Sequence, residues 1–159
     1  MISAGWSKSV CAHSQRVMVQ LRRKLGSFLK MTVRQRLLVL EAASLLALSR
    51  FALLVLPFGR IVPWLRRMPD AGPINTATVL AVRQAVTVAA RNVPWNAVCL
   101  PQAMAAKAML AWRGQGSAMH LGATMADDGL TAHAWLVAGG EIVVGEAGLP
   151  DMTPLTRFG

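Results

Sequence analysis

A chain of 159 residues with a formal net charge of +10 and 54% hydrophobic residues is long enough for one domain with a real core. Its two cysteines, Cys11 and Cys99, are too few for a disulfide framework, and the first 30 residues lack the apolar run and small-residue cleavage site of a secretory signal peptide. These features exclude a disulfide scaffold and predict a cytoplasmic protein with a free thiol at Cys99.

Positive charge is concentrated in the first half of the chain. Residues 1–69 hold twelve Lys or Arg and one acid, Glu41, whereas residues 70–159 hold five basic residues and six acids. This asymmetry predicts an anionic membrane surface, an acidic peptide or another protein as partner, and a solvated basic face is the plainer interpretation. Nucleic acid is disfavoured, because the basic residues lie among apolar residues without an aromatic platform.

Residues 1–31 are polar and basic, and we expect a loosely ordered extension; a true start at Met31 is a hypothesis that the intact mass of natively expressed protein would test. Thr32 and Gln35 then form a capping-box pattern before a long Leu-rich helix that Pro57 ends. This helix is long enough to span a membrane, but Glu41 and Arg50 would each cost about 2.5–3.5 kcal/mol near a bilayer centre. We therefore favour a buried or interface-packed helix over a span.

Two further helices and three strands are predicted after this point. Residues 58–73 form a broken amphipathic piece in which Trp64 stands beside two arginines, as at a membrane surface or a partner interface. Asn75 or Thr76 caps a helix that runs to residue 90, with an apolar stripe that recurs every three or four residues. A third helix covers residues 99–112, followed by strands over 117–125, 131–138 and 141–145. Helices followed by antiparallel strands predict an α+β fold.

Cys99 stands where a thiolate and an oxyanion would both be stabilised. Pro101 is tolerated only in a first helical turn, so Cys99 lies at the start of its helix. The partial positive charge and unpaired N–H groups of a helix N-terminus favour a thiolate and can hold the oxyanion of a tetrahedral intermediate. A small buried apolar residue is the competing interpretation of a free cysteine.

His133 is the candidate base. Strand alternation puts it on one face with Trp135, while Ala132, Ala134 and Leu136 form a small-residue face suited to packing on a helix. A histidine in such a position is often only structural. A strand histidine downstream of a helix-start cysteine nevertheless predicts a base and its nucleophile.

A third residue should orient the imidazole by accepting a hydrogen bond from its other nitrogen. Glu146 follows the next strand and is our first choice, with Asp151 second; Glu141 lies at a hairpin tip and is discounted. No spacing of His and Cys suits zinc, and no glycine-rich phosphate loop is present, so we expect neither metal nor cofactor.

Two segments, CLPQAMAAKAMLAWRGQGSAMHLGAT and AHAWLVAGGEIVVGE, together with the Pro-Trp that precedes Cys99, resemble the transglutaminase-like leader peptidases of lasso-peptide biosynthesis, the B proteins. The Leu-rich helix with one Glu and one Arg is also similar, and the resemblance covers roughly residues 32–158. It implies a papain/transglutaminase-like cysteine peptidase core, with Cys99 as nucleophile and His133 as base. The family's aspartate, about twelve residues after the histidine, corresponds here to Gly145. Either the adjacent Glu146 substitutes for it, or Asp151 or a backbone carbonyl orients the ring.

The resemblance also implies a function and partners. The chain would remove the leader from a ribosomally made precursor without ATP, beside a separate leader-recognition protein and an ATP-dependent macrolactam synthetase. We expect residues 1–31 to be the extension, 32–94 a helical part and 95–159 the catalytic core, with 32–159 as one domain. The alternatives are a transglutaminase-like acyltransferase and a non-catalytic, membrane-associated scaffold. The expected location is cytoplasmic, with contact at the inner membrane face left open.

Overall fold

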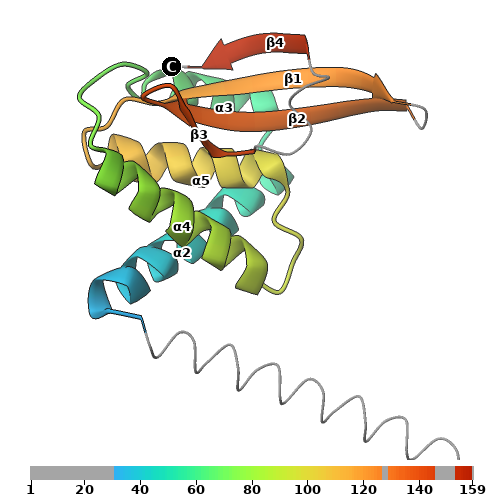
Figure 1. Ribbon diagram of the computed structural model, residues 1–159. Helices are drawn as coiled ribbons and strands as arrows, with labels where there is room; N and C mark the ends of the chain where they lie inside the picture. Colours follow the sequence, from blue (N-terminus) through green and yellow to red (C-terminus); the bar gives the residue numbers. More distant parts are fainter. Residues whose placement is uncertain (1–30, 127–128, 146–152, 159) are drawn as a thin grey trace, which may run out of the picture. The chain divides into compact units, whose positions relative to one another are not determined.

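The computed structural model describes residues 31–126, 129–145 and 153–158 of the chain (Figure 1). The chain divides into two units, Met1–Arg36 and Leu37–Gly159, so their boundary falls inside the first described helix, α2 (Val33–Val55). The extension predicted for residues 1–31 lies outside the described residues except for Met31. Thr32 and Gln35 form the predicted capping box, because each side chain accepts a hydrogen bond from the other residue's backbone N–H, at 3.0 and 3.3 Å.

Three helices follow α2 in the second unit. They are α3 (Phe58–Arg66), α4 (Thr76–Asn92) and α5 (Cys99–Ala111). Asn75 caps α4 as predicted, since its side chain accepts a hydrogen bond from the N–H of Thr78. The buried stripe of α4 includes Ala85 and Ala89 beside the predicted valines, whereas Ala90 is only half-buried. Almost every residue of α5 from Pro101 to Leu110 is buried, which makes α5 the central helix of the unit.

A four-stranded antiparallel sheet covers α5. Its strands are β1 (Ala118–Ala126), β2 (Gly129–Ala138), β3 (Glu141–Val144) and β4 (Thr153–Phe158), in the order β3-β2-β1-β4. Figure 1 shows α5 along one face of the sheet, and α5 contacts β1, β2 and β3. Gly139 and Gly140 make the predicted turn between β2 and β3, both with positive φ, as a two-residue hairpin turn requires. The predicted α+β order of helices and then antiparallel strands is confirmed.

The strand β4 was not predicted from the sequence. It pairs with β1 at the edge of the sheet opposite β3 and contains Pro154. A proline inside a run argues against a central strand and is tolerated at an edge, where one N–H has no ladder partner. The predicted turn residues Asp127 and Asp128 lie outside the described residues.

The two charges within the Leu-rich part of α2 that follows Arg36 are both used in tertiary contacts. Glu41 accepts two hydrogen bonds from the guanidinium of Arg113, at 2.6 and 2.9 Å, just beyond the end of α5. The side-chain hydrogen bond to Glu41 raises the pKa of Arg113, burial opposes this, and the negative charge of Glu41 adds to the rise. Arg50 donates a hydrogen bond to the carbonyl of Asn96, in the loop before α5. These contacts explain how a Leu-rich helix carries charge at its middle.

We expect the substitution Glu41→Gln to lower the free energy of unfolding by about 1–2 kcal/mol, because the pair is bidentate and both side chains are about 70% buried, at 28% and 27% exposure. The measurement is chemical denaturation followed by circular dichroism. Glu141→Gln is the matched control, since Glu141 is exposed at the start of β3. Equal stability of the two variants would show that the pair contributes nothing measurable.

Candidate functional site

Cys99 is the first residue of α5, as the position of Pro101 predicted, and it carries a free, half-buried thiol. The preceding residue, Val98, has no side chain able to cap the helix, and no acid stands in the first turn. Val98 therefore does not cap the N-terminal N–H groups of α5, and the first turn of the helix holds no carboxylate that would neutralise this end. Such a helix start favours negative charge on a nearby sulfur or oxyanion.

The loop that leads into Cys99 is held from two sides. The guanidinium of Arg50 donates to the carbonyl of Asn96 at 3.3 Å, and the side-chain amide of Gln102 donates to the carbonyl of Ala97 at 2.5 Å. These bonds connect the loop to α2 and to the first turn of α5. They fix the direction from which the chain enters the helix, and with it the place of Cys99. No pattern in the sequence indicates this role of Arg50 and Gln102.

Trp95 lies four residues before Cys99 in the same loop. Its indole N–H is buried and has no hydrogen-bond partner in the part of the chain that the structure describes. An unsatisfied buried donor costs free energy, about 1–3 kcal/mol.

His133 lies in the middle of β2 and is half-buried. The alternation is as predicted for most of β2, where Ala134, Leu136 and Ala138 are buried on one face and His133 and Trp135 share the other. Ala132, which was predicted to share the packed face, is exposed. Trp135 stacks on the rings of both neighbouring histidines, with centroid distances of 6.5 Å to His133 and 5.4 Å to His120. The indole therefore lies to one side of the His133 imidazole, with the two ring planes 19° apart.

The backbone carbonyl of Gly145 sets the orientation of this imidazole from the other side. The Nε2 atom of His133 lies 2.9 Å from the carbonyl oxygen of Gly145. A carbonyl oxygen only accepts hydrogen bonds, so Nε2 must carry a proton and donate. In the neutral ring Nδ1 then holds the lone pair and is the atom able to act as a base. A backbone carbonyl, with no residue specified, was one of the three orienting groups that the resemblance left open, beside Glu146 and Asp151.

The position of Gly145 requires glycine. Its φ is +86°, and a Cβ built there would meet the carbonyl oxygen of Ala134 and lie 2.8 Å from the Cα of Trp135. At the position where the resembled family has an aspartate, this chain therefore has a residue without a side chain. The backbone carbonyl of Gly145 contacts His133 instead. Glu146, the predicted third residue, and its alternative Asp151 both lie outside the described residues.

The structure brings together some of the predicted site and not all of it. The helix of Cys99 packs against the strand of His133, but the buried side chains of that strand, Ala134, Leu136 and Ala138, lie on the face opposite to His133. The ring of His133 contacts the carbonyl of Gly145. Among the described residues, the His133 imidazole makes a hydrogen bond to the Gly145 carbonyl and none to the thiol of Cys99. Catalytic hydrogen bonds are often long in the absence of substrate and tighten in the complex. No group of three or more potential metal ligands occurs in the described ranges.

A cysteine at the start of a central helix and a histidine on a strand that packs against that helix supply the residue types of a nucleophile and its base. A family model for the transglutaminase-like superfamily matches residues 42–157. The chain belongs to the transglutaminase-like superfamily, which includes cysteine peptidases and acyltransferases. Neither the curated proteins nor the solved structures contain a significant match.

Proposed function

We propose that this protein is a cysteine peptidase that removes the leader from a lasso-peptide precursor. Membership of a superfamily rich in cysteine-dependent enzymes supports a thiol mechanism. The resemblance of the residues around Cys99 and His133 to the leader peptidases supports the substrate class. The observation that carries the chemistry is the hydrogen bond from His133 Nε2 to the Gly145 carbonyl, which leaves Nδ1 as the base.

In the proposed mechanism Nδ1 of His133 takes the thiol proton, and the sulfur of Cys99 attacks the carbonyl carbon between leader and core. The N-terminal N–H groups of α5 hold the oxyanion. His133 then protonates the leaving amine of the core, which departs and leaves the leader as a thioester. Water attacks the thioester, the carbon–sulfur bond breaks, and a proton returns to sulfur.

The proposed partners are the precursor leader, a separate leader-recognition protein and an ATP-dependent macrolactam synthetase. Peptide hydrolysis itself needs no ATP, and the amine freed by this step is the group that a macrolactam synthetase acylates. The proposed location is cytoplasmic, where a free catalytic thiol stays reduced.

We expect mass spectrometry of a precursor, incubated with this protein and its leader-recognition partner, to show separate leader and core with the wild type. Cys99→Ala should leave the precursor intact, with cleavage lowered by at least about 10³-fold, because the nucleophile is lost. Cys11→Ala is the matched control and should cleave normally. A leader product with the mass of an added amine, in place of water, would identify an acyltransferase. An unchanged rate in Cys99→Ala would contradict the nucleophile.

A further inference from the structure

The helix α2 is apolar on two opposite faces, and among the described residues only one of these faces packs against the rest of the protein. The buried face consists of Val39, Ala42, Leu45, Leu46 and Ser49. The opposite face carries six large apolar side chains that are between 55% and 75% exposed: Leu37, Leu40, Leu48, Phe51, Leu54 and Val55. Their spacing is mostly three residues, with one gap of eight between Leu40 and Leu48, and it places them along one side of α2 as an exposed stripe. An exposed apolar stripe of this length marks an interaction surface.

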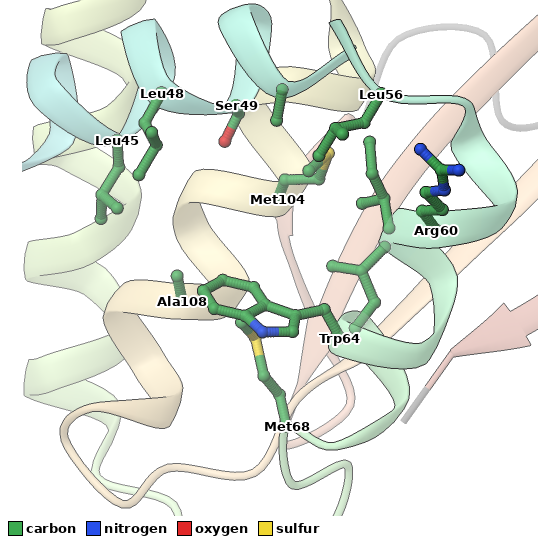
Figure 2. A pocket seen from close by; sticks show the side chains of 12 residues that line it. Leu45, Leu48, Ser49, Leu56, Arg60, Trp64, Met68, Met104 and Ala108 are labelled. Carbon is green, nitrogen blue, oxygen red and sulfur yellow. The ribbon is translucent and has the colours of Figure 1, made fainter.

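The exposed stripe continues onto α3 around an apolar pocket. The pocket has a volume of about 270 Å³ and is lined from α2, α3 and α5. Figure 2 shows the indole of Trp64 reaching from α3 across this pocket, with Leu48 and Leu56 on the α2 side and Arg60 at its rim. Trp64 is 63% exposed. A large exposed indole beside arginine is typical of side chains that lie at the level of lipid headgroups.

Charge on this surface favours an anionic occupant. Residues 37–69 hold four arginines and a single acid, Glu41, whose carboxylate is paired with Arg113. Arg60 and Arg67 are exposed, in α3 and directly after it. A protein partner would match the apolar stripe, but an anionic bilayer matches the stripe, the indole and the arginines together, with apolar side chains among acyl chains and arginines at phosphate.

The tertiary contacts of α2 favour binding at the surface of a bilayer over crossing it. By length and composition alone α2 could cross a membrane, a test that core helices also pass. Crossing would break the bidentate pair of Glu41 with Arg113 and the bond from Arg50 to Asn96, and would remove the buried face from the core. We propose that α2 and α3 bind the surface of a bilayer containing anionic phospholipid, with α2 lying in the membrane plane and its exposed stripe in the headgroup region.

The test is flotation of the full-length protein with vesicles of phosphatidylglycerol and phosphatidylcholine in equal amounts, beside vesicles of phosphatidylcholine alone. Binding is expected to the anionic vesicles and to fall as salt is raised. The double variant Leu48→Ser/Phe51→Ser should lower the partition coefficient by at least about tenfold, because two apolar side chains leave the interface. Arg67→Gln should lower it by about fivefold.

Matched controls distinguish binding by this surface from non-specific hydrophobic or electrostatic binding. All variants keep the basic residues 1–30, so a loss of binding cannot come from that segment. Leu80→Ser replaces a leucine on α4 that is 55% exposed, close to the 57% of Leu48, and Arg91→Gln replaces an exposed arginine at the end of α4. Both should bind vesicles like the wild type, and circular dichroism should show all variants folded. Binding that survives the double variant, or no binding to anionic vesicles, would overturn the proposal. A dimer in light scattering that the double variant dissociates, without vesicle binding, would assign the stripe to a second copy.

Discussion

The substitution His133→Gln is expected to lower leader cleavage by about 10²–10⁴-fold, the usual contribution of a positioned general base. Glutamine keeps a polar side chain able to donate to the Gly145 carbonyl, so the hydrogen bond to the backbone need not be lost. It has no basic nitrogen to take the thiol proton. The loss should therefore appear in kcat, and alkylation of Cys99 by iodoacetamide at neutral pH should also slow.

His120→Gln is the matched control for this prediction. Both histidine rings stack on Trp135, His120 at the shorter distance, but only His133 is hydrogen-bonded to Gly145 among the contacts described. If stacking alone mattered, the two substitutions would have similar effects. We expect near-wild-type cleavage for His120→Gln, and thermal melts should show that both variants fold. Equal losses of cleavage in the two variants would show that His133 has a structural role and is not the general base.

The positions of Cys99 and His133 could be predicted from the sequence because local rules decide them. A proline two residues after Cys99 fixes the start of α5, and alternation along β2 fixes which residues accompany His133. The capping box at Thr32 and the cap at Asn75 were predictable for the same reason. In each case the deciding interaction lies within four residues.

The contacts that complete the site span longer distances along the chain or use the backbone. Arg50 contacts the loop before Cys99 from 46 residues away, and Glu41 meets Arg113 over 72 residues. In the sequence Arg50 and Glu41 are isolated charges in an apolar helix. Hydrophobic periodicity does not identify the residue that contacts such a charge from another part of the chain. The partner of His133 is a carbonyl, which every residue has, so no side-chain pattern identifies it.

The close approach of Gly145 to β2 predicts a large loss of cleavage when Gly145 is replaced. A residue with a side chain at this position would have φ near +86° and a Cβ in contact with the Ala134 carbonyl and the backbone of Trp135. The end of β3 would have to move away from β2, and the carbonyl of Gly145 would move off the Nε2 of His133. We expect Gly145→Ala to lower cleavage by about 10- to 100-fold, because displacement of a base by about 1 Å has effects of that size.

Gly140→Ala separates backbone strain from this contact. Gly140 has nearly the same φ, +84°, but a Cβ there meets nothing within 4 Å. Its alanine variant should lose about 1–2 kcal/mol of stability from left-handed strain and keep its cleavage rate. Gly145→Ala should be less stable and less active, as measured by thermal melts and by cleavage of the precursor. Gly145→Asp restores the acid of the resembled family and should still be impaired, because its Cβ meets the same atoms. A rise in cleavage with Gly145→Asp would show that β3 adjusts and that a carboxylate orients His133 better than the carbonyl does.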